Sequence, residues 1–181
     1  MDLYDAIRRR RSIKAFRPDP LERALVEKLL EAGTWAPNHR KNEPWFFHVI
    51  TGNARERLVR ALAGTGGADA EERAAFLGQK LLSAPVLVAV TVADDAVKKP
   101  VDDEENYAAV MTAIQNLLLA ATAEGLGSIL RTGKTIRDPA LARFLELAPG
   151  ERVAGIVYLG WPAESREGSR RPLAERMRWI E

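Results

Sequence analysis

The 181-residue sequence contains no cysteine, and this absence excludes several kinds of chemistry. Without thiols the chain can form no disulfide, no thiolate metal site and no cysteine nucleophile. Histidine is scarce as well: only His39 and His48 occur, without paired carboxylates beside them, so no metal site is expected. His39 lies in a predicted polar loop, and two interpretations remain open for it: that it binds a ligand, or that it has no functional role. His48 alternates with Phe47 and Val49 in a predicted strand, which favours a non-catalytic role.

Long hydrophobic runs are also missing. The longest, at residues 85–90 and 117–121, are far shorter than the roughly 20 apolar residues that a membrane helix needs. The first residues include Asp2 and Asp5 and lack the apolar core of a signal peptide. We therefore expect a soluble, cytoplasmic protein that makes no contact with a membrane.

Neither sign of charge dominates, because 27 Lys and Arg residues are nearly matched by 25 Asp and Glu residues. A nucleic-acid-binding protein usually has a large basic excess, so no nucleic-acid partner is expected. The densest basic run, Arg8 to Arg11, would spread over about 300° of a helix and could not line one duplex. No GxSxG nucleophile motif occurs, and the glycine-rich residues 64–67 and 125–128 match no phosphate-binding fingerprint.

The sequence does contain short, well-marked elements. Helices are predicted over residues 2–10, over 21–32 with Gly33 as the stop, from a cap at Asn53 to about 63, toward residue 82, over 102–124 and from Asp138 onward. Strands are predicted at 45–51, 85–92, 128–132 and 152–162. The second strand is apolar on both faces and should be buried and central. Acidic residues 102–105 suit a helix N-terminus better than a divalent cation. Four strands among about six helices, without regular alternation, predict a single α+β domain over residues 1–181.

Two basic segments offer donors for an anion. Arg10 and Arg11 end the first predicted helix beside Ser12 and Lys14, so a guanidinium fork, a hydroxyl and an ammonium group can converge on one phosphate. Arg170 and Arg171 lie in a predicted loop, which suits either anion binding or simple solvation.

Three stretches taken together resemble the nitroreductase family of FMN-dependent oxidoreductases. They are RRSIKAF at 10–16, the loop from AP at 36–37 to the PW before the strand at 45–51, and QNLLLAATAEGLGSILRTG at 115–133. The last strand and the tail RRPLAERMRW are similar to the closing segment of the family. The resemblance covers nearly the whole chain in the right order, and the short length resembles a compact bacterial branch.

The resemblance implies a three-layer α+β fold, with a central and mostly antiparallel sheet flanked by helices. It also implies a homodimer with FMN at two sites between the subunits. The implied activity is a ping-pong exchange: NADH or NADPH reduces the flavin and leaves, and a nitroaromatic, a quinone or a similar small oxidant is then reduced. Dehalogenation, flavin fragmentation, or flavin binding without nicotinamide turnover remain alternatives, because one fold supports many activities.

The resemblance also implies a set of cofactor-binding residues. They are Arg10, Arg11, Ser12, Lys14, Trp35, His39, Leu130, Arg131, Thr132, Arg170 and Arg171. Within this set Arg10, Arg170 and Arg171 match positions at the phosphate, Lys14 matches a position near the pyrimidine edge, and Trp35 and His39 match positions that reach the flavin from the partner subunit.

A second implied set concerns the nicotinamide. Residues Ala120, Ala121, Thr122, Ala123, Glu124 and Gly125 match a segment assigned to nicotinamide binding in the short branch. Lys41 and Glu43 stand where the family commonly has Asn and Gln, so a flavin contact from these positions is not expected. The flavin carries the hydride chemistry, so no catalytic side chain is expected, and Lys14 and Arg131 would contribute positive charge.

Overall fold

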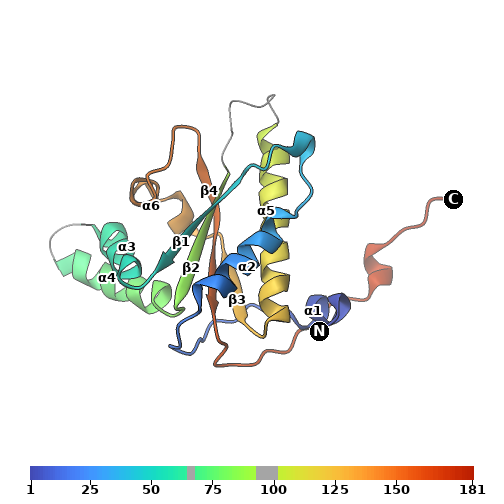
Figure 1. Cartoon of the computed structure of the whole chain (residues 1–181), viewed down its shortest axis with the longest axis horizontal. Helices are drawn as coiled ribbons and strands as arrows, with labels where there is room; N and C mark the ends of the chain where they lie inside the picture. Colours follow the sequence, from blue (N-terminus) through green and yellow to red (C-terminus); the bar gives the residue numbers. More distant parts are fainter. Residues whose placement is uncertain (65–67, 93–101) are drawn as a thin grey trace.

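A four-stranded antiparallel sheet forms the middle layer of the protein (Figure 1). The computed structural model describes residues 1–64, 68–92 and 102–181. The strands are β1 (Trp45–Thr51), β2 (Val86–Val92), β3 (Gly127–Arg131) and β4 (Arg152–Gly160), in the order β1-β2-β4-β3. The segment predicted as a central strand is therefore β2, with a neighbour on each side, and every residue of it is buried.

Helices cover both faces of the sheet and confirm the predicted α+β class (Figure 1). One face carries α2 (Arg23–Thr34) and the long α5 (Asp103–Ala123). The other carries α3 (Asn53–Ala63), α4 (Ala68–Leu81) and α6 (Pro139–Phe144). Helix α1 (Leu3–Arg9) contacts α5. Three 3-10 turns complete the described elements: His39–Lys41, Lys134–Arg137 and Leu173–Arg176.

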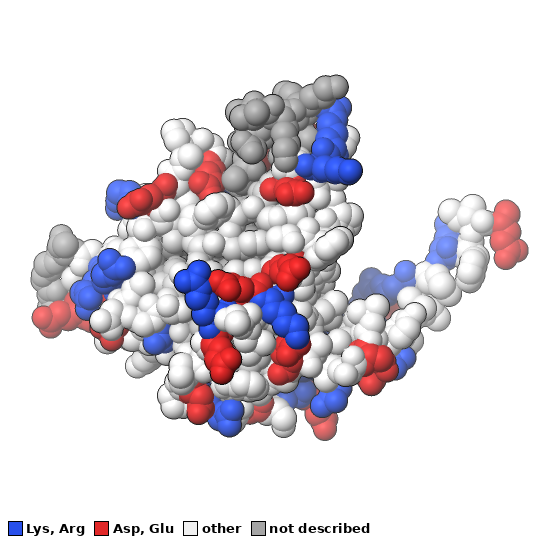
Figure 2. Space-filling view, in the orientation of Figure 1, with Lys and Arg blue, Asp and Glu red and all other residues white. Residues whose placement is uncertain are grey.

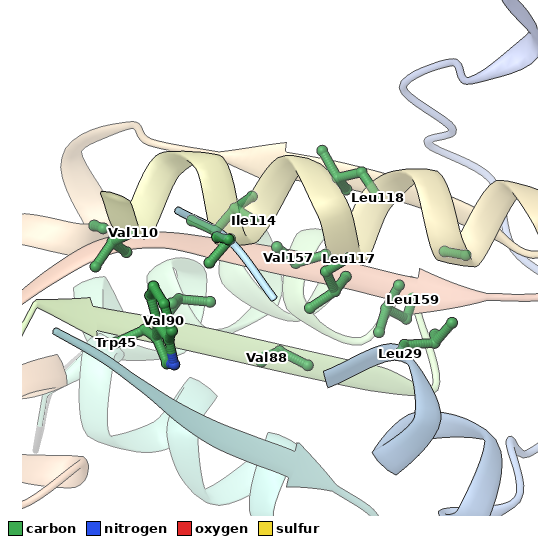
Figure 3. Close-up of a cluster of buried hydrophobic side chains, with 14 of the residues drawn as sticks. Leu29, Trp45, Val88, Val90, Val110, Ile114, Leu117, Leu118, Val157 and Leu159 are labelled. Atoms are coloured by element: carbon green, nitrogen blue, oxygen red, sulfur yellow. The ribbon is translucent and has the colours of Figure 1, made fainter. Parts of the chain in front are cut away.

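The core fills both spaces between the layers, which explains the continuous apolar run of β2. Val88 and Val90 point toward Ile114 and Leu117 of α5 (Figure 3), whereas Leu87 packs in the cluster on the opposite face. A strand covered on both sides loses the alternation of polar and apolar residues that a half-exposed strand shows. The same reason makes α5 apolar around most of its circumference.

Two glycine-related predictions were wrong in position. Gly33 does not stop α2 but lies inside it, where a Cβ atom would be 3.2 Å from the Phe47 ring and 3.3 Å from the Ala113 carbonyl oxygen. Its function is close packing rather than termination. Asn53 does not cap α3 but begins it; the cap is Gly52, whose φ of +51° favours glycine.

The remaining boundaries agree with the pattern within two residues. Of the glycine-rich residues 64–67, residues 65–67 lie outside the described residues. Asp102 and Asp138 cap α5 and α6 through side-chain hydrogen bonds to Glu104 N and Ala140 N. Among the described helices, none has the length and apolar character needed to cross a bilayer.

The last residues of the chain leave the body of the molecule (Figure 1). Residues 165–181 are exposed throughout, and Figure 1 shows their end extending away from the α1 side as an arm. This arm carries large apolar side chains, among them Trp179 and Ile180, the latter 90% exposed. Apolar groups held out in this way have no partner surface within the described part of the chain.

Candidate functional site

The segment that follows α1 is fixed along the beginning of β3. Ile13 N donates a 3.0 Å hydrogen bond to Ser128 O, and Ser12 forms a parallel bridge with Ser128. The Ile13 side chain is buried over Gly127, where a Cβ atom would lie 3.0 Å from it. Because alternate residues of an extended segment point in opposite directions, Ser12 and Lys14 are directed outward, and both are exposed.

Two of the predicted phosphate-binding arginines, Arg10 and Arg170, lie near each other at the end of α1. Burial first, then the nearby charges of Arg170 and Arg11, lower the pKa of Arg10, so the two ends of the chain bring cations together. Within the described residues no carboxylate pairs with Arg10. Elsewhere the opposite signs are interspersed: Figure 2 shows them mixed over α2, where Arg23 and Glu27 pair at 2.6 Å. A cluster of unmatched cations is suited to an anion.

Arg11 and Arg171 differ from Arg10. Arg11 Nη1 donates to the carbonyl oxygens of Arg8 and Arg10, at 2.5 and 2.8 Å, and so caps the C-terminal end of α1. Arg171 is exposed on the arm. Its neighbour in the chain, Arg170, donates a hydrogen bond to the Ser169 carbonyl oxygen. Arg11 therefore has a local structural role, whereas Arg10 and Arg170 remain available for a ligand.

A cavity of about 540 Å³ lies at the far end of β3, and we call it the β3 cavity. It is lined by Phe76, Leu77, Lys80, Leu81, Ile129, Leu130, Arg131, Thr132, Gly133, Lys134, Thr135, Ile136, Ile156 and Tyr158. Three of the predicted cofactor-binding residues, Leu130, Arg131 and Thr132, therefore line one cavity. Its lining is apolar with three cations, and none of these described residues is Asp or Glu. Its volume is in the range of small-molecule sites.

Sequence reasoning missed Lys80 and Tyr158 of this cavity. Lys80 Nζ lies 3.7 Å from the ring centroid of Phe76, and the Arg131 guanidinium carbon lies 5.2 Å from that of Tyr158. The i, i+4 spacing of Phe76 and Lys80 was a local signal that could have been found. Tyr158 had no such signal, because its position depends on the pairing of β3 with β4.

A second cavity of about 540 Å³, the α1 cavity, lies between α1, the end of α5 and residues 162–168. Of the predicted nicotinamide segment, Thr122 and Gly125 line it, beside Arg8 and Arg9. Ala121 is fully buried in the core, and the Glu124 carboxylate pairs with Lys28 at 2.7 Å. The structure therefore leaves only part of that segment accessible to a ligand.

His39 lies away from the arginine cluster. His39 Nδ1 is 2.9 Å from Glu105 Oε2 near the start of α5, whereas Arg8 and Arg9 share the α1 cavity with Thr122 near its end. The 17 residues between Glu105 and Thr122 correspond to about 26 Å of helix. Trp35 is 79% exposed at the end of α2. Within one chain His39 therefore does not share a site with Arg10.

The remaining polar residues considered from the sequence are His48, Lys41 and Glu43. His48 Nε2 lies 3.3 Å from Thr91 Oγ1, which donates to Glu151. In the loop before β1 the interior residue is Asn42, which bonds the Asn106 side chain, whereas Lys41 and Glu43 are exposed. Within the described ranges, no three His, Asp or Glu side chains are grouped as metal ligands would be.

Known proteins are similar to this chain in sequence and in fold. Residues 7–161 match the family model described as the nitroreductase family. YfhC of Bacillus subtilis, named as an NAD(P)H nitroreductase, is 32% identical over 180 residues, covering 96% of this chain and 92% of its own. A nitroreductase-like protein from Bacillus cereus is 31% identical, with a TM-score of 0.88 over 100% of this chain and 97% of its own. A nitroreductase from Desulfovibrio desulfuricans solved with FMN is 30% identical, with a TM-score of 0.81 over 100% and 98%.

Proposed function

The chain belongs to the nitroreductase family, and from this we propose that it is an FMN-dependent oxidoreductase. It would use NADH or NADPH to reduce nitroaromatics, quinones or similar small oxidants, as one domain of residues 1–181 in the cytoplasm. The observation that carries the proposal is the arrangement of two features along β3. The unmatched cations Arg10 and Arg170 lie at the segment docked on its beginning, and the acid-free β3 cavity lies at its end.

The residues present fit FMN in chemical type and in spacing. Arg10 and Arg170 would hold the phosphate, with Arg171 beside them. From Ser128 to Arg131 is about 10 Å of extended strand, which suits a ribityl chain. Ser12 offers a hydroxyl donor to that chain, and the aromatic and apolar lining of the β3 cavity suits the ring.

Bound FMN would supply the acceptance and donation of hydride. The protein would supply positive charge and would exclude water from the flavin ring. Arg131, which lines the β3 cavity, would place positive charge where negative charge develops on reduction, and Lys14 would add to it. The apolar walls would make that charge more effective by excluding water. No acidic side chain among the described lining residues of the β3 cavity opposes this effect. We expect ping-pong kinetics, in which the nicotinamide product leaves before the oxidant binds.

We propose further that the active form is a homodimer with composite sites. His39 is separated from Arg10 by most of the length of α5, so it can reach a flavin at Arg10 only in a second copy of the chain, and Trp35 is proposed to reach it in the same way. The exposed arm supports the same proposal, because its apolar residues need a surface to cover them. A second copy would also cover the exposed apolar residues of α1, which are Leu3, Tyr4 and Ile7.

A visible spectrum of the purified protein, followed by anaerobic addition of NADH and then NADPH, tests the proposal. We expect a flavin spectrum that bleaches with at least one nicotinamide and recovers when a quinone is added. A flavin spectrum that neither nicotinamide bleaches would leave a flavin-binding protein without this turnover. A protein that shows no flavin spectrum even after reconstitution with FMN contradicts the proposal.

A further inference from the structure

We infer that Tyr158 is a positioning residue, which holds the Arg131 guanidinium at the β3 cavity so that its charge raises the reduction potential of the bound flavin. The inference rests on the proposed function and adds how the redox potential of that site is set. Two independent relationships carry it: the register of β3 against β4, and the way in which Arg131 is held without a counter-charge.

The register places the two side chains on one face of the sheet. Ile129 is paired with Tyr158, and Arg131 is paired with Ile156. Arg131 and Tyr158 are therefore diagonal neighbours across an antiparallel pair, a separation that long side chains bridge. The guanidinium carbon of Arg131 lies 5.2 Å from the ring centroid, within the range of a cation–π contact.

The ring of Tyr158 holds the Arg131 guanidinium without neutralising its positive charge. Within the described residues no carboxylate pairs with Arg131, and its buried Nε has no hydrogen-bond partner there. A carboxylate would fix the guanidinium but cancel its field at the flavin. An aromatic face fixes it through the ring quadrupole and leaves the positive charge in place. Desolvation strengthens such a contact, and both residues line the cavity.

Tyr158 is suited to this role because it is rigid and neutral. It is only 3% exposed and packs in the core cluster with Ile129, Leu81 and Ile156. Burial raises the pKa of its phenol, and nearby Arg131 opposes this in part, so the side chain carries no charge of its own at neutral pH. Phe76 under Lys80 offers a contrast: the same kind of contact is made on a ring that is 56% exposed on α4.

The consequence can be measured as a difference between two oxidation states. A fixed cation stabilises reduced FMN more than oxidised FMN. Removing the ring by Tyr158→Leu should release Arg131 and weaken the binding of reduced FMN about tenfold relative to oxidised FMN, which lowers a two-electron midpoint potential by about 30 mV. Tyr158→Phe keeps the ring and should keep the potential near that of the wild type.

The decisive experiment is a double-mutant cycle with Arg131→Met, read out by anaerobic potentiometric titration. If Tyr158 acts through Arg131, Tyr158→Leu should cause no further fall in potential in the Arg131→Met background. A full additional fall, or an unchanged potential in the Tyr158→Leu single variant, overturns the inference. Tyr158→Met, which fills the space without a ring, serves as the second variant if the leucine variant does not fold, and the same outcomes apply.

A second readout does not depend on the flavin. Chemical denaturation of the FMN-free wild type and of the three variants should show that the effects of Tyr158→Leu and Arg131→Met are not additive. Additive effects overturn the contact itself. If the cycle shows non-additive effects but the wild type binds no FMN, the result contradicts the proposed function and, with it, the redox role of Tyr158.

Discussion

The carboxylate of Glu164 accepts a hydrogen bond from the backbone N–H of Lys14 at 2.6 Å, joining the two ends of the chain. The same oxygen accepts from Ala15 N at 3.1 Å and lies 3.0 Å from Arg166 Nε. A local loop could not hold the segment so firmly, because its backbone donors would be left to water. Glu164 thus fixes the backbone from which the Lys14 side chain projects.

This contact should make stability depend on acid. Hydrogen bonds from Arg166 and then from the Lys14 amide lower the pKa of Glu164 from 4.5 to about 2. Since the folded pKa lies below the unfolded one, the stabilisation is complete above the unfolded value and is lost as the pH falls toward the folded one. The difference in unfolding free energy between the wild type and Glu164→Gln should be constant above about pH 5 and shrink below it. Denaturation at a series of pH values measures it, and a constant difference at all pH values contradicts the assignment.

Lys14→Ala should lower the reduction potential of the flavin and slow its reduction by nicotinamide. In the proposed site the ammonium group would stabilise the negative charge of the reduced form, so its removal should cost on the order of 30 mV for each tenfold loss in relative affinity. Potentiometric titration and stopped-flow reduction measure the two effects. Lys28→Ala is the matched control, because Lys28 pairs with Glu124 away from the β3 cavity. An unchanged potential in the Lys14 variant would remove Lys14 from the electrostatic role.

Arg170→Gln should have opposite effects on the free and the FMN-bound protein. In the free protein Arg170 repels Arg10, so the substitution should raise the pKa of Arg10 and leave stability equal or higher. With FMN it should weaken binding about tenfold or more, the usual loss for one charge-assisted hydrogen bond. Fluorescence titration of FMN measures the affinity. Arg178→Gln, farther along the arm, is the control, and equal losses in both variants would indicate only a general effect of charge.

Gly155→Ala should destabilise the protein by about 1–3 kcal/mol through overpacking. A Cβ atom at this position in β4 would lie 2.5 Å from Leu130 Cδ1 and 3.4 Å from the Arg131 carbonyl oxygen. Urea denaturation measures the loss. Gly133→Ala is the control, since a Cβ atom there meets nothing within 4 Å and the change should stay within about 0.5 kcal/mol. Equal effects of the two substitutions would contradict the close approach of Leu130 to β4.

The parts that sequence patterns predicted are those that local chemistry determines. Aromatic and β-branched residues and the length of the apolar runs predicted β1 and β2, and Asp102 and Asp138 were recognised as helix signals. The positions that failed depend on tertiary contact. Glycine is unfavourable inside a helix, so Gly33 was predicted to end α2. The close approach of the Phe47 ring instead determines its role, which is close packing within the helix.

The candidate site shows the same division. Arg10 and Lys14 belong to a contiguous motif, so they could be assigned from the sequence together with its resemblance to a family. Tyr158 and Lys80 reach the β3 cavity from β4 and α4, far apart in the chain, and only the register of the sheet and the packing of α4 bring them to Arg131. Sequence spacing carries no information about such a convergence.

A composite dimeric site should allow two defective chains to restore each other. Arg10→Gln and Trp35→Ala should each lower activity in a homodimer, but a heterodimer of the two has one site with both changes and one with neither. Purified through two different tags, that heterodimer should keep about half of the wild-type activity. A heterodimer of Arg10→Gln with Arg170→Gln is the control: these residues lie together within one chain, so both of its sites should remain impaired. Equal activity of the two heterodimers would show that Trp35 acts in the same chain as Arg10.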